Sequence, residues 1–231
     1  MTCRNAQGAL PGGVTTSRRM GAMRLDHVVF AARPEGLAAT VEELEVRLGT
    51  LITEGGIHPR FGTRNAILPL AGGEYLEVVD VLDHPAAEKA PFGRAVKRRV
   101  QAGGGWLGWV VSVGDITPVE QRLGREAVQG NRRRPDNFDL RWKQLGVNGL
   151  INDPLLPFFI QWEVDESERP AAKGGTLALG RLELAGDPEA LAAWLGEPAD
   201  HPLDDHDVEW VDGARGIVAV ELSTPRGAVR I

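Results

Sequence analysis

Short runs of β-branched and aromatic residues alternate with helix-like segments along the chain, and their order repeats. Residues 25–31 form the first such run and are typical of a strand. In residues 37–48, leucine and valine recur at three- and four-residue spacing, which predicts an amphipathic helix that ends at Gly49. Two strand candidates follow, at residues 61–70 and 74–81. The glycine pairs Gly55-Gly56 and Gly72-Gly73 are taken as the turns before them. The pattern predicts a β-α-β-β-β unit.

The same order returns twice after a helix-prone linker. In the second unit, a strand-like run at residues 106–113 precedes a helix that Thr117-Pro118 opens. In the third, a run at residues 176–184 precedes a helix with Asp187-Pro188 at its start. Further strand candidates complete each unit: residues 127–132, 138–145 and 158–164 in the second, and residues 208–211, 216–223 and 228–231 in the third. Repeated β-α-β-β-β units favour an α+β fold over a doubly wound sheet, which would alternate single strands and helices.

This organisation predicts a leader, a two-module domain and a C-terminal unit. The parts are residues 1–22, residues 23–168 with modules at 23–84 and 104–166, and a related β-α-β-β-β unit at residues 174–231. The leader carries arginines but no acidic residue, and glycine and proline interrupt its apolar residues, so no secretory signal is expected. We expect it to be disordered. It is either an organelle transit peptide or an upstream extension, with Met20 or Met23 as the effective start.

Composition and charge exclude several classes of partner and of protein. The 231 residues carry a formal net charge of −6, which gives no general attraction to nucleic acid or to an anionic membrane surface. No window approaches the run of about 18 apolar residues that a membrane-spanning helix needs. The single cysteine, Cys3, cannot form an internal disulfide, which fits a reducing compartment. The sequence therefore predicts a cytoplasmic protein whose partner is a small molecule, and neither nucleic acid nor a membrane.

Three segments carry a resemblance to a known family. They are Leu25-Asp-His-Val-Val-Phe30, Gly55-Gly-Ile-His-Pro-Arg-Phe-Gly-Thr-Arg-Asn65 with Tyr75-Leu-Glu-Val78, and Pro157-Phe-Phe-Ile-Gln-Trp162. With them, most of residues 23–164 resembles the glyoxalase-like proteins of the vicinal oxygen chelate superfamily, and the third unit is similar to the extra C-terminal segment of some larger members. The resemblance implies that two β-α-β-β-β modules pair about a pseudo-twofold axis and curl a mixed sheet into a cup. The unpaired outer strands of such modules make a homodimer reasonable.

The resemblance also implies a metal site, because metal-dependent members hold a divalent ion through a His on the first strand and a carboxylate on the last strand of each module. In the first module, His27 and Glu77 stand at these positions. In the second, Trp109 lies opposite His27 and Gln161 lies opposite Glu77. Trp cannot bind a metal, and neutral Gln binds one weakly. His27 and Glu77 form a partial site for Zn, Mn, Ni or Fe, which Gln161, His58 or water would complete, and a protein without metal is the alternative.

Strand alternation also singles out Glu77. It shares one face of its strand with Tyr75 and Val79, while Leu76 and Val78 face the other side. A buried carboxylate must be paired, metal-bound or protonated. We therefore expect Glu77 to line a functional cavity as the catalytic group.

Several polar residues near the predicted cup have a structural alternative to a functional role. His58, Thr63 and Asn65 lie in a glycine-bounded stretch, where turns and caps explain polar residues as well as substrate contacts do. The basic run at residues 132–134 lacks interleaved aromatic residues, and we expect a solvated face or an anion contact there. The residues expected to contact a substrate are His58, Thr63, Asn65, Trp109 and Trp162.

Two functions follow from these residues. The first is an enzyme that binds a small oxygen-rich or carbonyl-containing molecule in the cup and acts as a lyase, isomerase or dioxygenase. A divalent ion on His27 and Glu77 would polarise a substrate oxygen, or Glu77 alone would abstract a proton. The second is a metal-free protein that binds or sequesters an aromatic or apolar ligand. Its stacking surface would come from Tyr75, Trp109, Trp142, Phe159 and Trp162.

Overall fold

The computed structural model describes residues 23–196 and 201–231, and its architecture confirms the predicted fold class. The leader predicted at residues 1–22 lies outside the described residues. The first unit comprises β1 (Arg24–Ala31), α1 (Leu37–Leu48), β2 (Thr53–His58), β3 (Thr63–Pro69) and β4 (Tyr75–Val81). The helices α2 (Pro85–Lys89) and α3 (Pro91–Gln101) lead to the second unit, which comprises β5 (Gly105–Ser112), α4 (Thr117–Leu123), β6 (Val128–Arg133), β7 (Asp139–Leu145) and β8 (Phe158–Trp162). The third unit comprises β9 (Ala178–Ala185), α5 (Pro188–Leu195), β10 (Asp207–Trp210), β11 (Gly216–Thr224) and β12 (Gly227–Arg230). Among the described residues, no helix is both long and apolar enough to cross a membrane.

The strands of the first two units form one closed barrel in the order β1-β4-β3-β2-β6-β7-β8-β5. Within each unit the first strand runs parallel to the last, so β1 pairs with β4 and β5 pairs with β8. The units join where β1 runs antiparallel to β5 and where β2 meets β6. The sequence predicted a cupped sheet, and the structure closes that cup into a barrel. The inward side chains of both units therefore meet in one enclosed space.

The glycine pair expected to form a turn, Gly55-Gly56, instead lies inside β2, and this corrects the prediction. Gly56 has a φ of +133°, and a Cβ added there would lie 2.0 Å from the backbone oxygen of Arg133. A residue without a side chain is needed for β2 to approach β6 this closely. At Gly55, an added Cβ would lie 2.3 Å from Asn65 Oδ1. The two glycines thus close the barrel and leave room inside it for a polar side chain.

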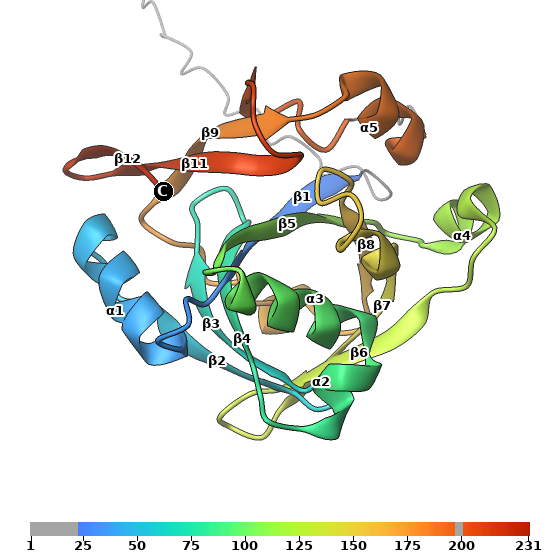
Figure 1. Cartoon of the computed structure of the whole chain (residues 1–231), viewed down its shortest axis with the longest axis horizontal. Helices are drawn as coiled ribbons and strands as arrows, with labels where there is room; N and C mark the ends of the chain where they lie inside the picture. Colours follow the sequence, from blue (N-terminus) through green and yellow to red (C-terminus); the bar gives the residue numbers. More distant parts are fainter. Residues whose placement is uncertain (1–22, 197–200) are drawn as a thin grey trace, which may run out of the picture.

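The linker helix α3 packs on the inner core of the barrel and lies across the barrel in the view of Figure 1. Its buried residues Phe92, Ala95 and Val96 belong to the same cluster as the inward-facing valines of three barrel strands: Val29, Val79 and Val110. An apolar stripe on a helix is stabilised when it covers an apolar surface in this way. The interior of the barrel is therefore closed by α3 on that side.

The third unit forms a separate sheet in the order β10-β9-β11-β12, which lies against the outside of the barrel (orange to red in Figure 1). Its inner face contributes leucine and valine to a second buried cluster that also contains the outward-facing residues of β5 and β8. The members that make this contact include Leu182, Leu184, Val220 and Leu222 from the sheet and Trp109, Val111 and Phe159 from the barrel. Apolar side chains on both sides of the barrel wall are thus buried, inside by α3 and outside by the third unit.

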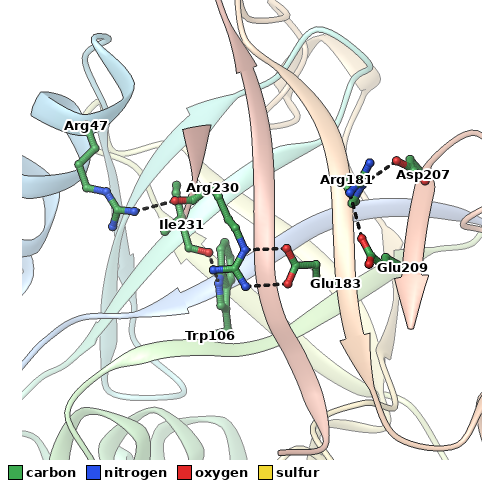
Figure 2. A network of polar contacts seen from close by, with 8 residues as sticks. All are labelled: Arg47, Trp106, Arg181, Glu183, Asp207, Glu209, Arg230 and Ile231. Carbon is green, nitrogen blue, oxygen red and sulfur yellow. Dashed lines mark hydrogen bonds and ion pairs between the residues drawn. The ribbon is translucent and has the colours of Figure 1, made fainter. Parts of the chain in front are cut away.

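The end of the chain is bonded to the barrel unit (Figure 2). Arg47 of α1 donates a hydrogen bond of 2.7 Å to the backbone oxygen of Arg230, and the Trp106 indole donates one of 3.2 Å to the backbone oxygen of Ile231. The Arg230 guanidinium also donates two bonds of 2.6 Å to Glu183 on β9. These contacts fix the position of the third unit, while the buried cluster supplies most of the stabilisation, because exposed ion pairs contribute little.

Candidate functional site

An irregularity in β1 brings Asp26 and His27 to the same polar network. The register of β1 against β5 shifts between Leu25 and His27, as at a β-bulge, and such a shift re-aims side chains. Asp26 Oδ1 lies 2.7 Å from His27 Nδ1, and Asp26 Oδ2 accepts a hydrogen bond of 2.9 Å from the Trp162 indole. Because the carboxylate accepts, the hydrogen of His27 is assigned to Nδ1. The Nε2 atom of His27 is then turned toward Glu77.

The Glu77 carboxylate lies at the centre of the polar groups inside the barrel. Its residue is only 4% exposed. Asn65 Nδ2 donates a hydrogen bond of 2.5 Å to Oε1, and His58 Nε2 lies 3.8 Å from the same oxygen. His27 Nε2 lies 3.7 Å from Oε2. Strand neighbours produce this cluster, since β4 lies between β1 and β3 in the barrel.

His58 is held in a neutral form inside the barrel. Its Nδ1 lies 2.9 Å from the Thr63 hydroxyl oxygen, and the two residues are directly paired between β2 and β3. Burial lowers the pKa of His58 to about 3, with smaller contributions from the charges of Arg132 and His27. An imidazole in this state donates or accepts hydrogen bonds without carrying a charge near neutral pH.

Tyr75 forms the wall beside His27. The two rings stack with their centroids 4.3 Å apart and an angle of 17° between their planes. Burial, followed by the charges of Asp26 and Glu77, raises the pKa of the Tyr75 hydroxyl well above its usual value. The phenol therefore keeps its proton.

These groups face a small cavity of about 30 Å³, which has room for a few water molecules. Of its thirteen lining residues, six are Phe, Tyr or Trp and six carry another polar or charged side chain. The lining residues are His27, His58, Phe61, Asn65, Tyr75, Glu77, Phe92, Arg132, Trp142, Gln144, Phe158, Ile160 and Trp162. Tyr75 and Trp162 also line a wider groove between the barrel and the third unit. These two side chains separate the cavity from the groove.

Two residues expected in the cup, Trp109 and Gln161, lie outside it. Trp109 is 1% exposed, donates a hydrogen bond of 2.7 Å to the backbone oxygen of Leu155 and packs in the cluster beneath the third unit. Gln161 Oε1 accepts a hydrogen bond of 3.0 Å from the backbone N–H of Ile116, at the start of α4. Thr63 is also set back, because its hydroxyl serves His58 and does not line the cavity. Phe159, expected as stacking surface, belongs to the outer cluster as well.

A shift of one residue explains the error at Trp109 and Gln161. His27 pairs with Tyr75 at the start of β4, and Val110 pairs with Phe158 at the start of β8. Val110 is therefore the counterpart of His27, and by the same count Ile160 is the counterpart of Glu77. Because successive strand residues face opposite sides, a one-residue error moves a side chain from the inside of the barrel to the outside.

Arg132 and Gln144 are cavity residues that the sequence did not identify. Arg132 belongs to the basic run that was expected to form a solvated face or an anion contact, and it is 5% exposed and lines the cavity. The alternation of β6 places Gly130 on the same inner face, where an added Cβ would lie 2.4 Å from the Trp142 ring. The indole of Trp142 fills that space and donates a hydrogen bond of 2.8 Å to Gln144 Oε1. A glycine and an arginine two positions apart on a predicted strand were the available signal.

The donor set required for a divalent ion is incomplete in this cavity. Among residues 23–196 and 201–231, no three His, Cys, Asp or Glu side chains come together as a metal site. His27 and His58 approach different oxygens of Glu77, and Asn65 already donates to one of these oxygens.

The second module does not supply the missing ligands. Apolar Val110 and Ile160 occupy its two counterpart positions, and Gln161 is engaged at α4. The guanidinium of Arg132 places a positive charge beside the same space, which disfavours a cation. The residues present do not fit a divalent ion, and the chemistry proposed below uses none.

The comparisons with known proteins agree with this fold. Residues 25–199 match the protein family described as "Glyoxalase-like domain". A hypothetical protein from Staphylococcus aureus is similar in structure, with 18% identity, a TM-score of 0.58 and coverage of 91% of this chain and 86% of that one. This likeness shows the fold alone. A variant of Streptomyces coelicolor methylmalonyl-CoA epimerase in complex with 2-nitronate-propionyl-CoA matches with 18% identity, a TM-score of 0.42 and coverage of 61% of this chain and 95% of that one. The search of curated proteins found no match.

Divalent ions are expected to change the thermal stability of chelator-treated protein very little. Because a ligand stabilises a fold only when it binds the native state, Zn²⁺, Mn²⁺, Ni²⁺ or Fe²⁺ should each shift Tm by less than about 1 °C. Thermal unfolding with and without each ion measures this. A rise of several degrees that is absent in the His27→Ala variant would show that a metal binds here after all.

The low pKa of His58 predicts a loss of stability in mild acid. Between the unfolded value of 6.5 and the folded value of about 3, the unfolded chain binds a proton that the native protein does not, so the free energy of unfolding falls as pH decreases. Between about pH 7 and about pH 5 this one group should lower the free energy of unfolding by about 2 kcal/mol.

Urea unfolding at the two pH values tests this prediction in variants. His58→Gln keeps a hydrogen-bonding group next to Thr63. Between about pH 7 and about pH 5 its free energy of unfolding should fall by about 2 kcal/mol less than that of the wild type. His84→Asn, at an exposed position, is the control and should behave like the wild type. Equal losses in all three proteins would mean that His58 is not buried in the neutral form.

Proposed function

Because the chain belongs to the glyoxalase-like domain family of the vicinal oxygen chelate superfamily, we propose that it binds a small carbonyl-containing molecule inside the barrel and that Glu77 moves a proton on that molecule. The activity would be that of an isomerase or a lyase. The ligand enters through the groove beside Tyr75 and Trp162 and is enclosed on the opposite side by α3.

The observation that supports this proposal is the setting of Glu77. Among the described residues that line the cavity, it is the one acidic side chain. Asn65 holds Oε1, so the carboxylate has a fixed orientation, and Oε2 is available on the side of His27. A general base must be positioned against the proton that it removes, and a side chain held by its neighbours meets this condition.

In the proposed step, a C–H bond next to the carbonyl group of the ligand breaks and its proton goes to Glu77 Oε2. The electron pair of that bond moves to the carbonyl oxygen, which becomes an enolate oxygen. Return of the proton to another face or carbon gives an isomer. In the lyase reaction, the enolate pair forms a C=C bond to the neighbouring carbon, the bond from that carbon to the leaving group breaks, and the proton on Glu77 goes to the leaving group. In both cases the same carboxylate acts first as base and then as acid.

The neighbouring histidines have distinct parts in this scheme. With its hydrogen on Nδ1 and bonded to Asp26, His27 presents Nε2 to Glu77 and can share the transferred proton. His58, in the tautomer that accepts the Thr63 hydroxyl proton at Nδ1, presents an Nε2–H group as a donor to an enolate oxygen. Because its pKa lies at about 3, it donates as a neutral group and does not protonate the enolate.

The aromatic wall favours a second candidate function, which is binding without chemistry. Phe61, Phe92, Trp142 and Trp162 surround the polar cluster, and Trp142 and Trp162 meet edge to face with their centroids 5.6 Å apart. Such a wall contributes affinity for an apolar ligand whatever Glu77 does. The two candidates differ in a single measurable event, the exchange of a ligand proton.

Exchange of carbon-bound hydrogen with D₂O tests the role of Glu77. We expect the wild-type protein to accelerate exchange at the carbon next to the carbonyl in at least one member of a panel of small ketones, aldehydes and oxo acids. Glu77→Gln keeps the shape of the side chain but removes the base, so exchange should slow by about 100-fold or more. Loss of the proton signal in NMR spectra measures the rate.

Glu54→Gln is the matched control, because Glu54 is an exposed carboxylate on β2, a strand of the same barrel. It should exchange protons at the wild-type rate. Exchange that persists in Glu77→Gln would exclude Glu77 as the base. A panel member that raises Tm without exchanging in the wild type would favour the binding function.

A further inference from the structure

We infer that Arg132 is the binding site for a carboxylate group of the ligand, so that the molecule taken into the barrel is a small oxo acid. This inference rests on the proposed function, because it names the chemical class of the molecule on which Glu77 acts. It follows from the position of one buried cation, its lack of partners and the distribution of charge around it.

The guanidinium of Arg132 is buried without a partner. Its residue is 5% exposed, and its Nε atom has no hydrogen-bond acceptor. Among the described residues, none of its side-chain nitrogens takes part in an ion pair, although nine other arginines form them: Arg33, Arg47, Arg64, Arg134, Arg141, Arg169, Arg181, Arg215 and Arg230. Arg132 is therefore unlike the surface arginines of the same protein.

An unpaired cation in this position destabilises the ligand-free fold. Moving a charged group out of water without a counter-ion is unfavourable. Glu77 attracts Arg132 electrostatically but lies beyond ion-pair distance, since its own contacts are with Asn65, His27 and His58. A ligand that pairs with Arg132 would explain why an unpaired guanidinium is buried inside the cavity.

The barrel order places Arg132 on a different wall of the cavity from Glu77. Arg132 is on β6, which lies three positions from β4, the strand of Glu77, and four positions from β1, the strand of His27, in the closed ring of eight strands. A ligand that occupies the cavity lies between these two walls. Its anionic end would pair with Arg132 while its reactive carbon lies toward Glu77, and this separation matches a molecule that carries both a carboxylate and a carbonyl group.

The charge balance favours a carboxylate over a phosphate. Arg132 is the one Lys or Arg side chain among the described residues that line the cavity, and Glu77 is the one acid. A monoanion neutralises Arg132 and leaves Glu77 as the only other charge. A phosphate dianion would instead bring excess negative charge toward Glu77 with a single cation to offset it. The planar guanidinium also matches a carboxylate through two parallel hydrogen bonds.

Paired ligands provide the test. A panel of small oxo acids with side chains of different size is compared with the methyl esters of the same acids and with inorganic phosphate, by isothermal titration calorimetry on the full chain. At least one acid is expected to bind about 10-fold or more tightly than its ester, with phosphate showing no binding at equal concentration. In Arg132→Gln this preference should disappear, and Arg132→Lys should recover part of it.

Arg133→Gln is the matched control, because Arg133 is the exposed neighbour on the same strand. It should retain the wild-type preference for acids. Acids and esters that bind equally well to the wild type would overturn the inference, as would a preference that survives in Arg132→Gln or a panel in which no acid binds.

A second measurement separates a binding role from a structural one. Because Arg132 has no partner to lose, the ligand-free Arg132→Gln protein should unfold at the wild-type Tm or above it. A lower Tm would mean that Arg132 stabilises the fold, and the inference would then be wrong.

The two proposals fail in different ways. If esters and acids bind alike and both exchange protons through Glu77, the carboxylate site is absent and the proposed function stands. If acids bind through Arg132 and no exchange depends on Glu77, the carboxylate site stands and the catalytic function fails.

Discussion

A carboxylate inside an aromatic barrel must be hydrogen-bonded, and the inner wall of the first module is arranged around this requirement for Glu77. Asn65 donates to one oxygen at 2.5 Å, and His27 and His58 approach the two oxygens from neighbouring strands. Each partner is itself fixed by a further residue, since Asp26 holds His27 and Thr63 holds His58. Gly55 leaves the space that Asn65 occupies. The polar cluster is thus a connected network, in which the orientation of Glu77 depends on contacts two side chains away.

The two modules share a topology but divide the chemistry between them. The first supplies the carboxylate and both imidazoles, whereas the second supplies aromatic and apolar wall together with one buried cation, Arg132. This asymmetry explains why the four-ligand metal pattern of the superfamily is absent among the described residues of this chain. A site with one base and one cation on separate walls is suited to an anionic carbonyl compound, whose carboxylate would pair with Arg132 while a C–H group next to its carbonyl faces Glu77.

Much of the fold was predictable from sequence because periodicity is a local property. The spacing of leucines in residues 37–48 and the repeated β-α-β-β-β order both correspond to elements of the structure, and alternation alone placed Glu77 with Tyr75 on one face of β4. The errors arose where facing direction depends on distant contacts. The counterparts of His27 and Glu77 in the second module were wrong by one residue, so Trp109 and Gln161 were assigned to the wrong side of the barrel. Arg132 was missed because its burial depends on barrel closure between β2 and β6, which are far apart in the sequence, and the alternation with Gly130 was only a weak local signal of it.

The central claim is that one ligand spans the barrel between Arg132 and Glu77, and a crystal structure with a bound oxo acid tests it most directly. The account predicts both carboxylate oxygens of the ligand within about 3 Å of the Arg132 guanidinium nitrogens. It also predicts the carbon next to the ligand carbonyl within about 3.5 Å of a Glu77 oxygen. A ligand found in the outer groove, or one whose carboxylate points away from Arg132 toward solvent, would contradict the account.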